Sequence, residues 1–348
     1  MVMTFRRRWL PPLLVSLTVV AALAGYVAAV ITPEVGSEFR PAEYVANVNS
    51  ADSKPLWTFG FVGDTQLGEA ITPVIFQQMR AAGVEFALHL GDLVDEAASD
   101  DEWERLIADA EAEQIRLLPV VGNHDRLRDR SDTGETRWRQ YFPQLHGTFY
   151  HFRHRGLNFV MLNSERSLIR GSEQEQFLRW QLEHHPGPTI VCLHRPVFSS
   201  GSRDWPAMLA RRLWVHGAVR ESDVVAVLAG HNHFYDRSLP LDGVTYVVSG
   251  GGSSKLYAAE TPAATSAKFV AGRNHFGLVD VYADHLAVRA IDLTGVEFDR
   301  FALPLPATSH EPGTAANRLA MELPSLAETL APKQPLRITR RRGATSHD

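Results

Sequence analysis

The chain has 348 residues, of which 45% are hydrophobic and 22% are charged, and its formal net charge at pH 7 is −5. This composition is that of an ordinary globular protein and excludes an intrinsically disordered chain or a membrane protein with many spans. The slight negative charge gives no general attraction for a polyanion, so long DNA or RNA is disfavoured as a partner.

The N-terminal segment is strongly apolar. Arginines at positions 6–8 precede an uncharged stretch, residues 9–32, whose apolar core approaches the roughly 20 residues that cross a bilayer. Residues 1–32 are therefore predicted to form a single transmembrane signal-anchor helix, with the arginines on the cytoplasmic side and the rest of the chain outside the cytoplasmic membrane. A cleavable signal peptide is the alternative, because Ala-Leu-Ala at 22–24 is similar to a cleavage site, and it would give a secreted or periplasmic protein.

Three further regions follow the N-terminal segment. Residues 33–54 show no sustained periodicity and contain Pro, Glu, Asn and Ser, so they are predicted to form a linker. Residues 55–303 are predicted to form one folded domain. From residue 304 to 348 the repeated Pro, Ala, Ser and Thr predict a mobile C-terminal tail.

Short apolar runs predict strands within the domain, and residues with helical spacing predict helices. The predicted strands are 56–62, 86–90, 117–121, 150–153, 158–162, 189–193, 224–229, 244–248, 277–282 and 286–291, and the predicted helices are 73–82, 101–113 and 173–184. The strands 277–282 and 286–291 are expected to complete the sheets. Strands that alternate with helices are typical of an α/β fold with parallel pairing.

Five of the predicted strands end in residue types that bind metal ions. These residues are Asp64, Asp92, Asn123 with His124, His194, and His231 with His233. A single Asp at the end of a strand is more often a helix cap or turn former than a ligand. However, ligands in open α/β sheets bind beyond the carboxyl ends of strands, where loops converge. The repeated pattern therefore favours one shared metal site.

The order and spacing of these residues resemble the calcineurin-like metallophosphoesterases. The motifs of that family are D-x-H, GD-x-x-D, GNH[DE], a lone His and GHxH. The corresponding segments here are DTQ at 64–66, GDLVD at 91–95, GNHD at 122–125, His194, and GHNH at 230–233. The first motif departs from the family because Gln66 stands in place of His. The resemblance covers roughly residues 56–291 and implies a four-layer α/β/β/α sandwich.

The resemblance also implies a pair of divalent metal ions. Metal one would take Asp64, Asp92 and His233, and metal two would take Asp92, Asn123, His194 and His231, with Asp92 as the bridge. Whether Gln66 is also a ligand stays open. Nitrogen and oxygen ligands suit Mn, Fe or Zn, and an amide oxygen at Gln66 favours Mn.

The resemblance gives His124 and Asp125 catalytic roles. His124 would lie near the leaving-group oxygen as an acid or electrostatic stabiliser, and Asp125 could orient its ring. A hydroxide held between the metals would attack the phosphorus. Arg126 and Arg195 are candidates to pair with a substrate phosphate, and a surface salt bridge is the alternative role for each.

Together these features predict an enzyme, a metal-dependent phosphatase or phosphodiesterase that hydrolyses a small phosphate ester outside the cytoplasmic membrane. A non-catalytic, membrane-anchored binding protein that keeps the fold is the alternative, because Gln66 departs from the family pattern. Monoester, diester and pyrophosphate substrates all stay open at this point, as does the oligomeric state.

Overall fold

The structure is a computed structural model that describes residues 20–28, 30, 32–37, 54–127, 134–145, 147–201, 205–258 and 261–305. A first sheet contains, in spatial order, β13 (Glu297–Pro304), β12 (His285–Asp292), β11 (His275–Val281), β1 (Trp57–Val62), β2 (Ala87–His89) and β3 (Leu117–Pro119). Strands β1, β2 and β3 pair in parallel, whereas β11 pairs antiparallel with β1. The carboxyl ends of β1, β2 and β3 therefore meet at one edge of this sheet.

A second sheet contains, in spatial order, β10 (Ser266–Val270), β8 (Tyr235–Ser238), β9 (Thr245–Ser249), β7 (Val224–Ala229), β6 (Thr189–Cys192), β5 (Leu157–Met161) and β4 (Tyr150–His154). Strands β5, β6, β7 and β9 are parallel to one another. Strands β4, β8 and β10 pair antiparallel with their neighbours.

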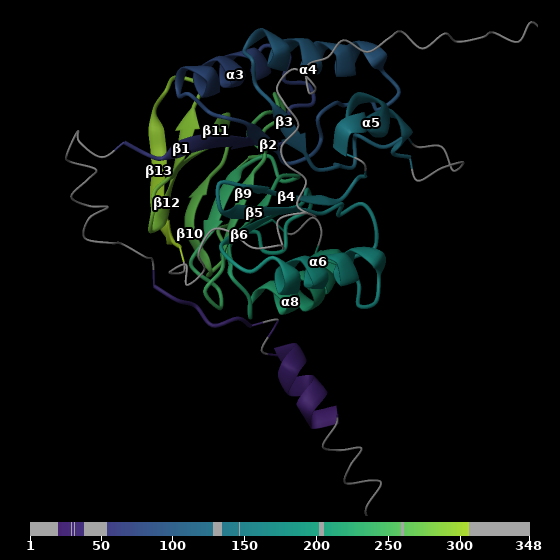
Figure 1. The fold of residues 1–348 in the computed structure, drawn as a ribbon, viewed down its shortest axis with the longest axis vertical. Coiled ribbons are helices and arrows are strands. Elements are labelled where there is room, and N and C mark those ends of the chain that lie inside the picture. Colours follow the sequence, from purple (N-terminus) through teal and green to yellow (C-terminus); the bar gives the residue numbers. More distant parts are fainter. Residues whose placement is uncertain are drawn as a thin grey trace, which may run out of the picture.

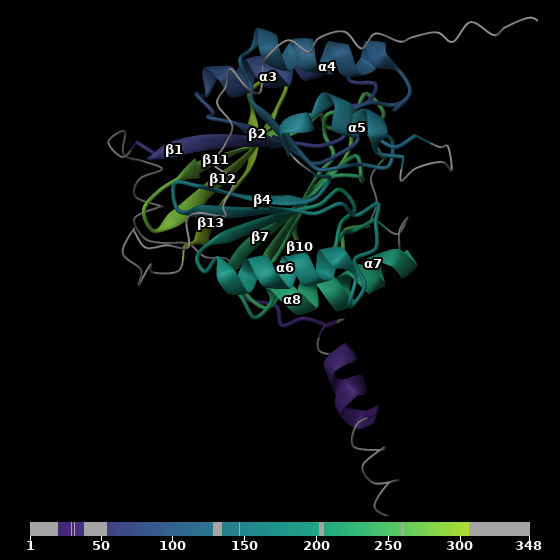
Figure 2. The ribbon, with the colours of Figure 1, turned by 45° about the vertical axis from the view of Figure 1, so that its right-hand side comes forward.

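Helices cover the outer faces of both sheets. They are α3 (Thr72–Ala81), α4 (Asp100–Ala112), α5 (Thr136–Tyr141), α6 (Glu173–His184), α7 (Trp205–Arg211) and α8 (Gly217–Val219), with a 3-10 turn at Pro143–Leu145 and a π-helical turn at Arg212–His216. Helices α3 and α4 lie outside the first sheet, and α6 and α8 lie outside the second (Figures 1 and 2). The prediction of an α/β sandwich with two sheets is confirmed.

An aromatic cluster joins the inner faces of the two sheets. Phe59 on β1 stacks on Phe86 with ring centroids 5.4 Å apart, and Phe152 on β4 stacks on Phe159 on β5 at 4.6 Å. Phe86 and Phe159 meet across the sheets at 5.5 Å. All four side chains are fully buried. Since each buried Phe contributes about 1.5–3 kcal/mol to stability, this cluster fixes how one sheet sits on the other.

The strands that the sequence did not predict are β8, β10 and β13. The expectation that residues 286–291 complete the sheet is wrong, because β13 pairs antiparallel with β12. β8 reads Tyr-Asp-Arg-Ser and has no apolar run, yet it is buried, because Arg237 forms an ion pair with Asp299 on β13 at 2.7 Å. A strand whose burial depends on an ion pair with a distant segment has no hydrophobic pattern in its sequence, so the sequence does not predict it.

The N-terminal part of the chain contacts the second half of the domain. Residues 20–28 are helical, and this helix lies beyond α8 in Figures 1 and 2. Val30 is fully buried, the backbone N–H of Glu34 donates to Asp242 Oδ1 at 2.8 Å, and Val35 forms a β-bridge with Leu241.

Three of the predicted regions fall mainly outside the described residues. Within the described part of the chain, no helix is both long enough and apolar enough to cross a membrane. Most of the predicted anchor, residues 1–19, lies outside that part, as do residues 38–53 of the predicted linker and the predicted tail from residue 306 onward.

Two buried histidines should make stability depend on pH. His151 on β4 stacks on His185 with ring centroids 4.5 Å apart, and within the described residues neither Nε2 has a hydrogen-bond partner. Burial, and then the neighbouring His185, lowers the pKa of His151 from 6.5 to about 4. The folded state therefore binds this proton less well than the unfolded state does. The contribution of neutral His151 to stability is fully present above the pKa that this residue has in the unfolded state. It is lost as the pH falls towards the pKa of His151 in the folded state.

We predict that wild-type protein loses about 1–2 kcal/mol more unfolding free energy than His151→Phe between about pH 7.5 and pH 5. Urea unfolding at a series of pH values measures this difference. His184→Phe removes an exposed imidazole at the end of α6 and serves as the matched control. Parallel pH curves for wild type and His151→Phe would contradict the prediction.

Candidate metal centre

The predicted ligands follow strands of both sheets. Asp64 and Gln66 follow β1, Asp92 follows β2, Asn123 follows β3, His194 follows β6, and His231 and His233 follow β7. Three of these residues, Asp64, Asp92 and His231, have positive φ angles of 61°, 53° and 68°. A non-glycine residue with this conformation is uncommon, and such strain is concentrated at functional sites.

Close backbone packing brings the loops together. A Cβ atom on Gly122 would lie 2.2 Å from Asp92 Oδ1, and one on Gly230 would lie 2.5 Å from Asp64 Oδ2. The glycines of the GNHD and GHNH motifs are therefore needed because a side chain there would collide with a predicted ligand.

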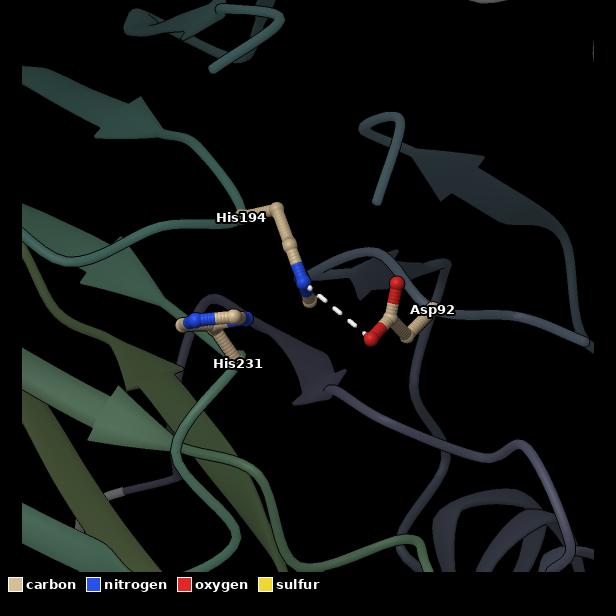
Figure 3. A group of neighbouring side chains, drawn as sticks. All are labelled: Asp92, His194 and His231. Carbon is tan, nitrogen blue, oxygen red and sulfur yellow. Dashed lines mark ion pairs between the residues drawn. The ribbon is translucent and has the colours of Figure 1, made fainter. Parts of the chain in front are cut away.

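One group of side chains surrounds the predicted position of metal two. His194 Nε2 lies 3.2 Å from Asp92 Oδ2 and 3.3 Å from Asn123 Oδ1. Asp92, His194 and His231 each offer a ligand atom, and these atoms lie within 4.8 Å of one another (Figure 3). The imidazole Nδ1 of His194 lies 2.8 Å from the carbonyl oxygen of Leu90, which leaves Nε2 to face the group.

A second group surrounds the predicted position of metal one. His233 Nε2 lies 3.4 Å from Asp64 Oδ1, and Gln66 Nε2 lies 3.3 Å from Asp92 Oδ2 and 3.2 Å from His233 Nε2. The structure thus brings all of the predicted ligands together, and Asp92 Oδ2 belongs to both groups. One carboxylate oxygen shared by two sets of nitrogen and oxygen donors fits a pair of divalent cations.

Gln66 has an oxygen that lacks a partner. Its side chain is 3% exposed, and Oε1 accepts no hydrogen bond from any described residue. The two ends of an amide have nearly the same shape, and their assignment follows from the surrounding hydrogen bonds. A rotated amide would direct the oxygen at Asp92 and His233, which is the arrangement that a ligand at this position requires.

The carboxylates control the charge of His194. Burial alone lowers the pKa of this imidazole, but the carboxylates of Asp92 and Asp64 more than offset burial and raise the pKa to about 10. Burial raises the pKa of Asp92, whereas His194 and the backbone N–H of His124 lower it, and the net shift is downward. When no metal is bound, a proton on His194 therefore balances part of the negative charge of the buried carboxylates. A metal ion that binds this imidazole must displace the proton.

Asp125 does not orient His124, contrary to the expectation from the sequence. Its carboxylate instead accepts hydrogen bonds from the backbone N–H groups of Gly122 at 2.7 Å, Asp92 at 3.0 Å, Leu93 at 2.7 Å and Val94 at 3.3 Å. Asp125 therefore joins the loop after β2 to the loop after β3 and has a positioning role.

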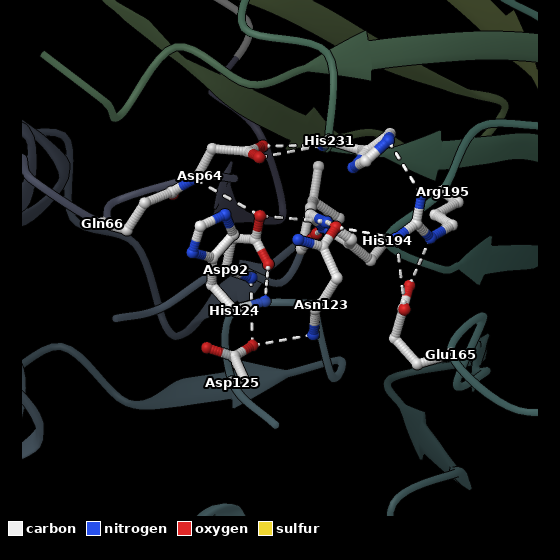
Figure 4. Close-up of polar contacts among 12 residues, drawn as sticks. Asp64, Gln66, Asp92, Asn123, His124, Asp125, Glu165, His194, Arg195 and His231 are labelled. Carbon is white, nitrogen blue, oxygen red and sulfur yellow. Dashed lines mark hydrogen bonds and ion pairs between the residues drawn. The ribbon is translucent and has the colours of Figure 1, made fainter. Parts of the chain in front are cut away.

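Asp95 is the residue that contacts the His124 ring. His124 Nδ1 lies 2.9 Å from the carbonyl oxygen of Asp95 and 3.2 Å from its Oδ1. The backbone N–H of His124 donates to Asp92 Oδ1 at 2.8 Å (Figure 4). The imidazole is thus fixed beside the shared carboxylate and is 31% exposed. The second Asp of GDLVD was visible in the sequence, but only the fold shows that it faces His124.

Two further residues had no signal in the sequence. Glu165 reaches the site from the loop after β5 and forms an ion pair with Arg195 at 2.6 Å. Tyr257 stacks on His233 with ring centroids 4.7 Å apart. Neither residue lies in a motif, so their roles depend on tertiary contacts.

Comparison with known sequences gives one family and distant relatives. Residues 58–235 match the family model described as calcineurin-like phosphoesterase. The chain is 26% identical over 220 residues to a phosphoenolpyruvate phosphatase of Allium cepa, covering 56% of this chain and 44% of that protein. It is 26% identical over 151 residues to an uncharacterized protein of Mycobacterium tuberculosis, covering 36% of this chain and 28% of that protein. The chain thus spans less than half the length of these relatives.

Solved structures share the fold. A purple acid phosphatase from yellow lupin seeds has a TM-score of 0.63 at 17% identity, covering 72% of this chain and 54% of that one. A dimetal phosphatase from Danio rerio has a TM-score of 0.52 at 17% identity, covering 72% of this chain and 99% of that one. GAP50, described as the anchor in the inner membrane complex of Plasmodium, has a TM-score of 0.58 at 16% identity, covering 73% and 90%. The family model matches more than half of the chain, in the region that carries the site, so this protein belongs to the calcineurin-like phosphoesterases.

Proposed function

We propose that this chain is a hydrolase that cleaves a phosphate ester with two divalent metal ions. The observation that carries the proposal is the convergence of donor atoms from both sheets on Asp92 Oδ2. Asp64, Asp92, His233 and Gln66 would hold one ion, and Asp92, Asn123, His194 and His231 would hold the other. When bound, such ions polarise phosphoryl oxygens and lower the pKa of water towards neutrality.

The chain's own residues supply orientation and a proton. Asp95 accepts from Nδ1 of His124, so when the ring carries both protons Nε2–H is the group that can donate a proton to a leaving-group oxygen and leave the ring neutral. Asp125 holds the backbone of Asp92 in place through its hydrogen bonds to two loops. The match to a phosphoenolpyruvate phosphatase supports a phosphate ester as the substrate class.

Manganese is the metal that we propose for the site with Gln66. An amide oxygen is a harder and weaker donor than the imidazole that most family members carry, so this site should favour Mn and hold Zn less tightly. The unpartnered, buried Oε1 of Gln66 supports this assignment.

Metal content and hydrolysis test the two-metal proposal in one variant. We predict that Asp92→Asn loses hydrolysis of generic mono- and diester substrates and binds fewer than two ions per chain, because a neutral amide does not bridge cations as a carboxylate does. Elemental analysis after dialysis and assays with Mn, Fe, Zn and Mg measure both effects. Full activity in Asp92→Asn would overturn the proposal. A wild type that holds two ions but cleaves no ester would favour the alternative of a binding protein.

His124 should affect turnover and leave metal binding intact. We predict that His124→Ala lowers kcat by about 10²–10⁴ with unchanged metal content, the usual loss when a general acid is removed. Asp95→Asn should give a smaller loss, because the backbone carbonyl of residue 95 still contacts Nδ1. Loss of metal from His124→Ala would make His124 a ligand and would contradict its assignment as the acid.

We also propose that the domain lies outside the cytoplasmic membrane, held there by residues 1–32. Support comes from the arginines at 6–8 and the uncharged stretch that follows them. We predict that protease added to cells with only the outer envelope opened digests the domain, while a cytoplasmic marker stays intact. Mass measurement of the mature protein separates an anchor from a cleaved signal peptide. Protection equal to that of the marker would contradict this location.

A further inference from the structure

A buried histidine lies beneath the loop that carries two predicted ligands of metal one. His89, the last residue of β2, is fully buried and pairs in register with Val62 of β1. It therefore lies on the same face of the first sheet as Gly60, two residues before Val62. A Cβ atom on Gly60 would meet Met79 of α3 at 2.8 Å, so this is the face that α3 covers. Packing between a sheet and a helix does not by itself explain an imidazole at this position.

The hydrogen bonds of His89 fix its tautomer. Thr65 Oγ1 donates its single hydrogen to the carbonyl oxygen of Leu93 at 3.0 Å. The same Oγ1 lies 2.9 Å from Nε2 of His89, so it accepts from an Nε2–H group. Burial, and then the charge of His194, lowers the pKa of His89 from 6.5 to about 3, so the ring is neutral. Its Nδ1 is then an acceptor, and within the described residues this atom has no hydrogen-bond partner.

This arrangement is unfavourable for His89 itself. A buried acceptor without a donor is costly, and an apolar side chain of similar size would avoid that cost. Among the described residues, the side-chain hydrogen bond that His89 makes is the one to Thr65. The contribution that is specific to the imidazole is therefore an N–H donor directed at the Thr65 hydroxyl.

Thr65 lies in a strained segment, between the predicted ligands Asp64 and Gln66. Asp64 has a φ angle of 61° and Leu67 has a φ angle of 58°. Two non-glycine residues within four positions thus adopt the left-handed conformation, which persists only where the surrounding structure supports it. The positions of Asp64 and Gln66 therefore depend on contacts that hold this segment from outside.

Three hydrogen bonds join this segment to the loop after β2. The first two come from backbone N–H groups, and the third comes from a side chain, which can rotate. The Nε2–H group of His89 restricts that rotation. The three bonds run from Asp64 N–H to the Gly91 oxygen at 2.9 Å, from Gln66 N–H to the Asp92 oxygen at 3.1 Å, and from the Thr65 hydroxyl to the Leu93 oxygen at 3.0 Å.

We propose that His89 is a positioning residue for metal one and acts through Thr65. Its N–H group holds the Thr65 hydroxyl, so that Asp64 and Gln66 keep their positions relative to the bridging Asp92. The inference rests on the proposed function, because it assigns His89 to one ion of the proposed pair. Metal two should not depend on this contact, because its other ligands follow β3, β6 and β7.

The test compares variants of His89 in the full chain. His89→Leu removes both ring nitrogens, whereas His89→Gln keeps an N–H donor at the same number of bonds from Cα. His151→Leu is the matched control, because His151 is also a buried histidine with an unpartnered nitrogen among the described residues, but it lies in the second sheet. Asn123→Ala removes a ligand of metal two alone and so shows which binding step belongs to which ion. Calorimetry measures the Mn and Zn affinities, and urea unfolding in chelator measures stability without metal.

We expect His89→Leu to bind metal one about 10-fold more weakly and to change the affinity for metal two by less than about 3-fold. His89→Gln should recover most of the affinity for metal one, and His151→Leu should bind both ions as wild type does. Thr65→Val should resemble His89→Leu, and the double variant should lose little more, because the two residues act as one unit. In chelator, the urea midpoint of His89→Leu should equal or exceed that of wild type, because the unpartnered nitrogen is gone.

An unchanged affinity for metal one in His89→Leu, an equal loss at both ions, or no recovery in His89→Gln would overturn the inference. A urea midpoint below that of wild type would also overturn it, since a residue that only stabilises the fold gives this result. The affinities do not depend on turnover. A wild type whose metal-one affinity depends on His89 but that cleaves no ester would therefore refute the proposed hydrolysis alone. A wild type that cleaves esters and whose metal-one affinity does not depend on His89 would refute this inference alone.

Discussion

The candidate metal centre depends on two sheets meeting at the carboxylate of Asp92. Asp92 follows β2 in the first sheet, and its Oδ2 lies 3.2 Å from Nε2 of His194, which follows β6 in the second sheet. The backbone N–H of His231 makes a second link of this kind, because it donates to Asp64 Oδ2 at 2.8 Å. Any shift of one sheet against the other would separate these pairs. The aromatic cluster around Phe86 and Phe159 therefore supports the site although it lies in the core.

The site also concentrates unfavourable groups. Asp64, Asp92 and His231 adopt left-handed backbone conformations, and two carboxylates lie buried next to one another. Each left-handed residue costs about 1–2 kcal/mol. The hydrogen bonds from four backbone N–H groups to Asp125 offset part of this cost. Bound cations would neutralise the carboxylates, so we infer that folding stability and metal binding are coupled in this protein.

The sequence predicted those elements of the structure that are determined by residues close to one another along the chain. Helix α6 has its predicted bounds because Ser172 caps it and acidic residues occupy its first turn. The convergence of the predicted ligands was foreseeable because each of these residues follows an apolar strand, and parallel strands bring such positions to one edge. The partners of side chains were not predictable. The contact of Asp95 with His124, the four bonds to Asp125, and the pairing of Glu165 with Arg195 all join segments that have no fixed spacing along the chain. β8 was missed for the same reason.

The contacts of residues 34–36 determine how far the domain can move from the N-terminal helix. Glu34 and Gly36 exchange backbone hydrogen bonds with Asp242 and Pro240, and Val30 packs near Gly217. These contacts leave almost no free tether between the helix and the domain, so the two should tumble as one body. If a membrane holds the helix, diffusion is confined to two dimensions, and the domain faces the lipid with the α8 side at a nearly constant height. Substrate must then diffuse to the membrane surface, because a domain held at this height cannot extend away from the membrane to meet it.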